Sequence, residues 1–502
     1  MRMGRGSSFF PLAGGILLLG GLWGCADEDA LYVDQPPWSD PLQDPAVGFL
    51  GYSDVEARET ACSGCHPGAE AEWARTAHAD AWAGLQESGH SQEFCEACHT
   101  VSALGNAVTE TQVGWTATQD PRFHDVQCES CHGPGLTHVA YPAGEQPLAA
   151  FEASLEGTNG CGECHNGSHH PFVEQWEESV HGQGPHTAYA ANVSLNACGP
   201  CHEGQKALEA TFGEDANYLE KGDGEFRTIT CVVCHDPHGS AYGGQLRAPI
   251  DTPDRGNLCM RCHTRRGLPW SFRGPHAAQG LLVLAEEVGY VPEGSSLNLD
   301  QIPNPHGPEN NRALCTTCHV ARRTITDQAT GEFLLESVGH TFEAINCLDE
   351  DGLPDPDGIC SVEERSFAGC TGSGCHGNET LARTAYLRTK DRLNVLLDEL
   401  WSDSDHDGIL ESTDEGLLPR VLAKGYSEDL NPSSPTVTPA KGAIWNAMLA
   451  WTDDRPQWSD GRVGGVDFSS HPNSGNGVHN PHLLEALLLA SIGDVREAYD
   501  LR

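Results

Sequence analysis

The chain has 502 residues and a net charge of −43, from 72 acidic and 29 basic side chains. This charge excludes nucleic acid as a plausible partner, because nucleic acid is bound chiefly by neutralising its phosphates with Lys and Arg, and it also disfavours an anionic membrane surface. Only 38% of the residues are hydrophobic, and 57 Gly and 31 Pro residues predict that much of the chain follows loops and turns.

The first segment, residues 1–24, has the features of a secretory signal. Two Arg residues precede an apolar run over residues 9–23, which is shorter than the roughly 20 residues that span a bilayer. Leu22 and Gly24 before Cys25 resemble a bacterial lipobox, so we predict that Cys25 is the lipid-modified start of the mature chain. Ordinary cleavage after Ala26 is the alternative. Residues 25–50, with four Pro among acidic residues, are predicted to form a tether.

Eight copies of the pattern Cys-x-x-Cys-His follow. With 25 His in 502 residues, a His follows a given Cys about 5% of the time by chance, so eight occurrences are not accidental. Two thiols on one turn of chain reach the two vinyl groups of a haem, and the next imidazole falls under the iron, so the motif predicts covalent c-type haem. Zinc and disulfides are the alternatives, but neither requires a His after each pair. The motifs comprise Cys62, Cys65, His66; Cys95, Cys98, His99; Cys128, Cys131, His132; Cys161, Cys164, His165; Cys198, Cys201, His202; Cys231, Cys234, His235; Cys259, Cys262, His263; and Cys315, Cys318, His319.

A ninth motif has a wider spacing between its thiols. Four residues, Thr-Gly-Ser-Gly, separate Cys370 from Cys375, and His376 follows. The flexible residues permit the longer span, so we predict nine haems, with attachment through Cys375 alone as the alternative. Cys347 and Cys360 are left over, and in an oxidising compartment such a pair is predicted to form a disulfide.

Each iron needs a second axial ligand, and the residue counts favour histidine. After residue 24 the chain has only two Met, whereas sixteen of the 25 His lie outside the nine motifs. Bis-histidine ligation is therefore expected at every haem, which predicts electron transfer without substrate binding at iron. We expect the distal ligands to be His78, His138, His170, His181, His238, His276, His306, His340 and His479, with His90, His124, His186 and His471 as alternatives.

Internal repetition guides that choice. The element Glu72-Trp73 with His78, after the first motif, matches Gln175-Trp176 with His181, after the fourth. Likewise, His138 and His238 follow the third and sixth motifs. The repeats predict three-haem modules over residues 51–150 and 151–250, a C-terminal three-haem region over 251–378, and a helical region over 379–502.

The motifs resemble those of multihaem c-type cytochromes. The run Cys-Glu-Ser-Cys-His-Gly-Pro-Gly from Cys128, the Cys-Val-Val-Cys-His-Asp-Pro-His element from Cys231 and the closing Gly477–Pro481 segment are similar to the superfamily of tetrahaem electron carriers, hydroxylamine oxidoreductase and multihaem nitrite reductase. The resemblance implies a mainly irregular and α-helical fold, with loops and short helices organised around covalent haems and little β structure. Pentahaem nitrite reductases carry a Lys after one Cys pair, whereas every motif here ends in His.

An acidic loop follows a predicted helix near the C-terminus. Asp403, Asp405 and Asp407 alternate before a Gly and Ile409, and Asp414 stands at the twelfth place, a pattern that resembles a calcium-binding EF-hand loop. A solvated acidic loop is the alternative. A second, weaker calcium candidate is the acidic stretch 349–357.

Together these features predict an exported lipoprotein cytochrome of the periplasm or cell surface, anchored to the outer membrane. We expect it to relay electrons between other redox proteins or cytochromes. One alternative is a multihaem oxidoreductase acting on a small nitrogen or sulfur compound, like hydroxylamine oxidoreductase or a nitrite or tetrathionate reductase. Another is a homo-oligomeric subunit of a conducting filament.

Overall fold

The computed structural model describes residues 46–144, 146–153, 159–183, 197–269, 274–327, 329–350, 353–355, 359–372, 375–431, 434–467 and 474–502. The chain divides into two units, residues 1–44 and 45–502, and every described residue belongs to the second. The predicted signal, Cys25 and most of the tether lie outside the described residues, as do His186 and His471. Within the described ranges, no helix is both long and apolar enough to cross a membrane.

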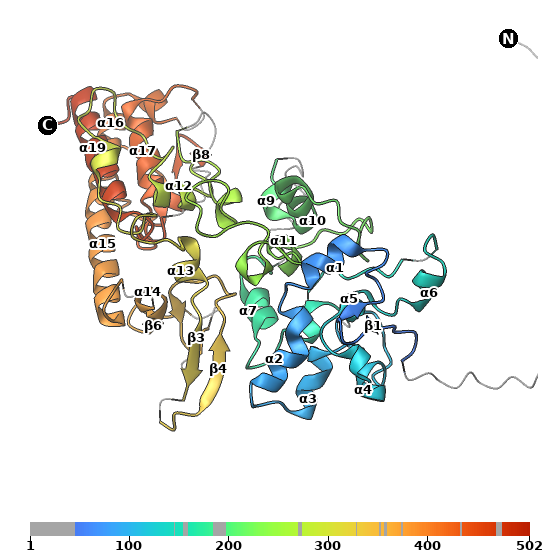
Figure 1. The fold of residues 1–502 in the computed structure, drawn as a ribbon. Helices are drawn as coiled ribbons and strands as arrows, with labels where there is room; N and C mark the ends of the chain where they lie inside the picture. Colours follow the sequence, from blue (N-terminus) through green and yellow to red (C-terminus); the bar gives the residue numbers. More distant parts are fainter. Residues whose placement is uncertain are drawn as a thin grey trace, which may run out of the picture. The chain divides into compact units, whose positions relative to one another are not determined.

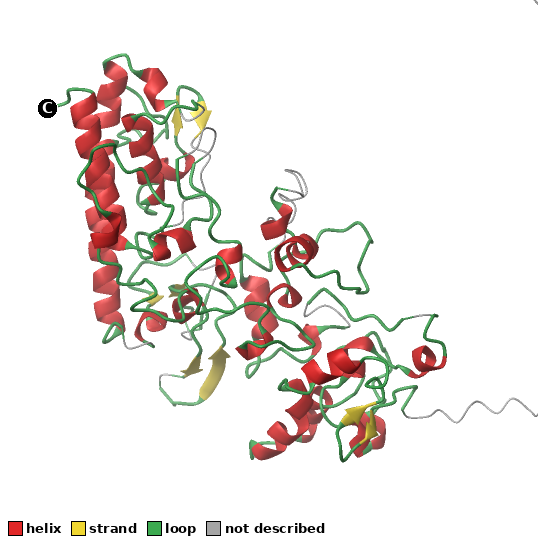
Figure 2. Ribbon diagram, turned by 45° about the horizontal axis from the view of Figure 1, so that its top comes forward, coloured by secondary structure: helices red, strands yellow, loops and turns green. Residues whose placement is uncertain are grey.

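Short helices and loops form the part of the chain that carries the motifs (Figures 1 and 2). The α-helices are α1 (Pro67–Trp73), α2 (Ala81–Glu87), α3 (Glu93–Glu96), α4 (Trp115–Thr118), α5 (Cys128–His132), α6 (Leu136–Ala140), α7 (Phe172–Glu178), α9 (Gly199–His202), α10 (Gly204–Lys206), α11 (Cys231–Cys234), α12 (Gln279–Leu284), α13 (Cys315–His319) and α14 (Ala368–Thr371). Single 3₁₀ turns occur at His78–Asp80, Ala97–His99, Pro121–Phe123, Cys161–Glu163, Gly243–Gln245, Cys259–Arg261, Leu299–Gln301 and Ser427–Leu430, and a π-helical turn at Ala207–Thr211. The prediction of a mainly irregular and helical fold is confirmed.

The described β structure consists of small antiparallel pairs. These are β1 (Tyr52–Asp54) with β2 (Glu59–Thr60), β3 (Arg323–Thr326) with β4 (Phe333–Ser337), β5 (Asn346–Cys347) with β6 (Arg365–Ser366), and β7 (Arg462–Val463) with β8 (Val466–Asp467). In the longest pair Arg323 faces Ser337, and an irregularity shifts the register after Ile325. Cys347 on β5 is joined to Cys360 by a disulfide, so the predicted partners are bonded in the structure.

The longer helices form a C-terminal helical unit, α15 (Glu379–Leu400), α16 (Leu417–Ala423), α17 (Pro439–Leu449), α18 (Gln457–Asp460) and α19 (Pro481–Ala498). Helices α15, α17 and α19 pack against one another around a large apolar cluster (Figure 1). Leu393, Leu397 and Leu400 recur at helical spacing on α15 and are all buried. This unit therefore has a conventional hydrophobic core.

Local sequence signals fix where the three main helices begin. The side chains of Asn378, Thr438 and Asn480 accept hydrogen bonds from the first-turn amides of α15, α17 and α19, and Pro439 and Pro481 occupy first helical positions. Capping side chains and an initial Pro satisfy or remove amides that lack partners within a helix. Residue 479 is thereby placed just before the cap of α19.

Buried polar contacts join the helical unit to the segment after the seventh motif. Trp445 Nε1 donates to the Gly267 carbonyl at 2.8 Å, and Asn446 Oδ1 accepts from the Tyr290 amide at 2.7 Å. Asn480 Nδ2 donates to the carbonyl of Leu282 at 3.0 Å. Each contact satisfies a buried polar group, so the helices are oriented against the region that carries the motifs.

Two leucines of α15 provide a matched test of this packing. Leu397 is 0% exposed, whereas Leu381 is 55% exposed. Because Leu397→Ala leaves a cavity in the core, it should lower the free energy of unfolding by about 2–5 kcal/mol. Leu381→Ala should change it by no more than about 0.5 kcal/mol. Denaturant titration of the haem-loaded protein, followed by far-ultraviolet circular dichroism, measures both. Equal losses in the two variants would contradict this core.

Candidate haem sites

The Cys-x-x-Cys-His motifs fold as single helical turns. In the first, fourth, fifth, sixth and seventh motifs, the amide of the closing His donates to the carbonyl of the first Cys at 2.9–3.0 Å. The turn brings the two thiols and the imidazole onto one stretch of backbone, as attachment to one porphyrin requires. Both thiols of the widened ninth motif, Cys370 and Cys375, line the same cavity as those of its neighbours, although residues 373–374 lie outside the described chain.

That cavity has a volume of about 2640 Å³. At least one cysteine from each of the second to ninth motifs lines it, together with many apolar side chains. A porphyrin is a large apolar group, so this lining fits it. Eight of the nine motifs thus share one cavity, and small apolar clusters pack around them.

The histidines are arranged in pairs, each joining a motif His to a predicted distal His. The separations of the ring centres are 6.4 Å for His66 and His138, 6.1 Å for His165 and His78, 6.1 Å for His132 and His238, 5.9 Å for His202 and His276, 6.3 Å for His235 and His340, 6.2 Å for His263 and His181, 6.2 Å for His319 and His479, and 6.3 Å for His376 and His306. Two imidazoles that bind one metal from opposite sides, each at about 2 Å, have ring centres roughly 6 Å apart. The observed spacing is therefore the one that an axially ligated iron needs.

The remaining motif His, His99, lies near the remaining distal candidate, His170. Burial lowers the pKa of His170, and the charge of nearby His99 lowers it further. Both residues line the central cavity. His170 therefore lies near the second motif, just as each of the other distal candidates lies near one motif His.

The surrounding groups hold several of these imidazoles in the form that binds metal. His99 Nδ1 donates to the Ala81 carbonyl at 2.8 Å, His132 Nδ1 to that of Pro147 at 2.9 Å, and His319 Nδ1 to that of Phe342 at 2.6 Å. A carbonyl only accepts, so the proton is on Nδ1 and Nε2 is left for iron. Burial, and then nearby His78, lower the pKa of His165 to about 4, which keeps that ring neutral at pH 7.

The repeat predicted from the sequence makes equivalent contacts in both copies. Trp73 Nε1 donates to the Val126 carbonyl and Trp176 Nε1 to that of Ile229, both at 2.8 Å and both two residues before a motif. His78 faces the fourth motif and His181 the seventh, so each contacts the motif three places after its own.

The second pair of repeated histidines is not equivalent. His138 faces the first motif, two places before the motif that it follows, whereas His238 faces the third motif, three places before its own. The two copies of the repeat therefore share their local structure, but His138 and His238 do not face equivalent motifs.

The alternative histidines have other environments. His124 stacks on Trp82, with 4.1 Å between ring centres, and contacts Trp115 in a tilted arrangement at 4.8 Å. His90 is exposed. Of these two, neither is paired with a motif His, and His124 contributes to aromatic packing.

Sequence reasoning missed some side chains of the cavity. Arg388 and Arg392 on α15 and His482 on α19 line it. Basic groups at this position suit the propionate groups of a porphyrin. The spacing of four residues between the two Arg on a predicted helix, in a chain with few basic residues, was the available signal.

A second missed residue is Glu129, inside the third motif. Its buried carboxylate accepts from the amides of Leu50, Gly51 and Gly135, the last two at 2.7 Å each. Gly135 is the residue before α6, which carries His138. Glu129 therefore links the third motif to the distal candidate of the first. Nothing in the spacing of the motifs signals this role.

The attachment cysteines of different motifs lie next to one another. The side chains lie beside one another in five pairs: Cys62 with Cys128, Cys98 with Cys164, Cys161 with Cys231, Cys201 with Cys262, and Cys259 with Cys315. Electrostatic interactions join Cys131 with Cys161, Cys234 with Cys259, and Cys318 with Cys375. In space, these contacts connect the motifs in the order one, three, four, six, seven, eight and nine. The second motif lies beside the fourth, and the fifth lies beside the seventh.

Parts of the chain are similar to known proteins. Residues 61–133 match the family model described as cytochrome c554 and c-prime, and residues 224–267 match the doubled CXXCH motif. The multiheme cytochrome MtrA of Shewanella baltica (strain OS185) is 29% identical over 149 residues, which cover 26% of this chain and 39% of that relative. The crystal structure of outer cell wall cytochrome OcwA has a TM-score of 0.46 and 16% identity, covering 82% of this chain and 78% of that chain.

The motifs and the two family models define a c-type cytochrome. The chain is a multihaem member of that class, and the predicted haem c cofactor is confirmed.

Removal of one predicted distal ligand tests the pairing. His138→Ala should leave the iron at the first motif five-coordinate, which adds a high-spin ferric signal in electron paramagnetic resonance. Added imidazole should restore the low-spin spectrum. His90→Ala, at an exposed His, should match the original protein. A purely low-spin His138→Ala spectrum without imidazole would contradict the assignment.

Proposed function

We propose that this multihaem cytochrome holds nine bis-histidine haems and relays electrons between redox proteins of the cell envelope or cell surface. The observation that carries the proposal is the set of histidine pairs, because two imidazoles at one iron leave no position for a substrate. Each bound haem supplies one-electron redox chemistry. The chain supplies attachment through the motif cysteines and axial coordination through the paired imidazoles.

The adjacency of the motifs supports transfer through the molecule. Contacts between cysteines run from Cys62 beside Cys128 to Cys318 beside Cys375, without a break in the series. Neighbouring attachment sites place their redox groups close together, as electron hopping needs. Electrons would thus enter near one end of the series and leave near the other, with other cytochromes or redox proteins as the partners.

The function is tested with the haem-loaded protein. Mass spectrometry should find nine haem groups per chain, and the oxidised protein should be low-spin throughout. The fully reduced protein should pass its electrons to an oxidised soluble cytochrome, but should not turn over nitrite, hydroxylamine or tetrathionate. Turnover of one of these compounds would overturn the carrier function in favour of an oxidoreductase. Concentration-dependent fibres in electron microscopy would overturn a discrete carrier in favour of a conducting filament.

A lipid anchor at Cys25 is part of the proposal. It rests on the lipobox-like residues before Cys25, since this segment lies outside the described chain. Acyl chains on Cys25 would hold the exported protein at the outer membrane. Cys25→Ala should move the cytochrome from the membrane fraction to the soluble periplasmic or extracellular fraction, with its haem content unchanged. Equal membrane retention of both proteins in cell fractionation would contradict the anchor.

A further inference from the structure

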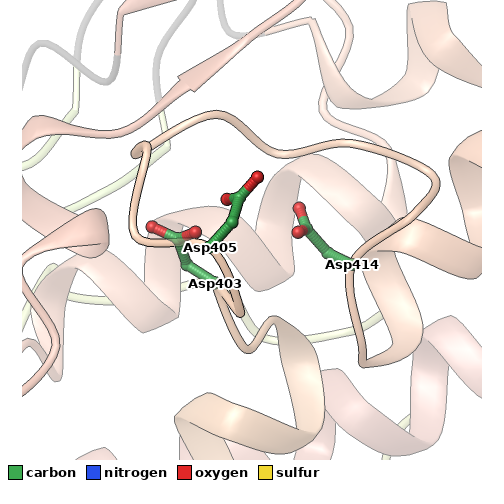
Figure 3. Close-up of side chains that lie close together, drawn as sticks. All are labelled: Asp403, Asp405 and Asp414. Carbon is green, nitrogen blue, oxygen red and sulfur yellow. The ribbon is translucent and has the colours of Figure 1, made fainter.

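The loop between α15 and α16 places three carboxylates together. One oxygen of each of Asp403, Asp405 and Asp414 lies within 4.8 Å of the others (Figure 3). Within the described ranges, none of the three is in an ion pair with Lys or Arg. Three uncompensated carboxylates repel one another at this separation, and a bound cation would remove the repulsion.

A second observation, independent of the clustering, points to a ligand. Asp403 is only 9% exposed. Its Oδ2 accepts from the Gly408 amide at 3.0 Å, whereas its Oδ1 is buried without a hydrogen-bond partner in the described structure. An unsatisfied buried carboxylate oxygen is costly unless a cation or another donor completes its surroundings.

Backbone hydrogen bonds fix the conformation of the loop at its base and in its middle. The Ser402 amide donates to the Glu415 carbonyl at 2.9 Å, which closes the loop at its base. Further along, the Leu410 amide donates to the Arg462 carbonyl and the Arg462 amide to that of Gly408, both at 2.7 Å. These bonds belong to the protein alone, so the carboxylates are positioned before any ion arrives.

Individual side chains are oriented as well. Asp414 Oδ2 accepts from Trp401 Nε1 at 3.0 Å and from the Glu411 amide at 2.8 Å. Gly408, the sixth residue of the twelve, has a positive φ of 71°, which allows the sharp turn expected there. Asp407 Oδ1 instead accepts from the Ile409 amide at 2.7 Å, and Asp407 is not in the cluster. Three of the five predicted calcium ligands, Asp403, Asp405 and Asp414, therefore lie together, whereas Asp407 and Ile409 are outside the group.

We propose that this loop binds one calcium ion through Asp403, Asp405 and Asp414. Calcium prefers several hard oxygen ligands in a flexible arrangement, and carboxylates satisfy that preference. The ion would connect the end of α15 to the start of α16 and so stabilise the C-terminal helical unit. The same unit carries His479, which faces His319. The second acidic stretch, residues 349–357, lies partly outside the described chain, and it is not included in the proposal.

The binding experiment uses the intact, haem-loaded protein after removal of metal with a chelator. Equilibrium dialysis with radioactive calcium should show one bound ion, and an equal concentration of magnesium should not displace it. Asp403→Asn should weaken binding at least tenfold. Glu428→Gln removes one negative charge from an exposed side chain of the same helical unit and should bind as the original protein does.

Thermal unfolding gives a second readout. Calcium should raise the midpoint of helix unfolding by several degrees in the original protein and in Glu428→Gln, but not in Asp403→Asn. If Asp403→Asn does not fold, Asp405→Asn at the exposed second ligand replaces it and should lose the same response. Absence of calcium binding in the original protein would overturn the proposal. So would unchanged binding in the folded Asp403→Asn or Asp405→Asn protein, which would place the ion elsewhere.

Discussion

A pair of imidazoles about 6 Å apart, one from a motif and the other from a distant segment, is the constraint on which this structure depends. His138 faces His66 across 72 positions of sequence, and His479 faces His319 across 160. Each pair therefore joins two segments that loops alone would not hold together. With covalent attachment beside every pair, the proposed coordination would take the place that a continuous aliphatic core has in most domains of this size.

The chemistry of the sites could be predicted from the sequence because it is local. The five residues of a Cys-x-x-Cys-His motif indicate an attachment site, and the counts of Met and His favour histidine as the second ligand. The partners could not be predicted, because they depend on packing between distant segments. His170 and His181, eleven residues apart, lie by the second and the seventh motif respectively. In the structure, His78 and His181 have equivalent partners in the two copies of the repeat, whereas His138 and His238 do not.

The C-terminal helical unit combines the two kinds of construction. A helical region was predicted over residues 379–502, and the Asn378 cap accounts for where α15 begins. Its relation to the haem sites was not predictable: Asn480 caps α19 and bonds to the Leu282 carbonyl, while the Val478 carbonyl accepts from His306 Nδ1. The hydrophobic core of the helical unit thus positions the predicted distal ligands of the eighth and ninth motifs. His479 precedes the cap of α19, and His306 is bonded to Val478.

A density map of the haem-loaded protein tests the histidine pairs most directly. One iron should lie midway between the two rings of each of the eight pairs with a measured separation, bound to Nε2 of both rings, and a ninth iron should lie between His99 and His170. An iron with only one protein ligand, or with an imidazole from outside its assigned pair, would contradict bis-histidine ligation by these pairs.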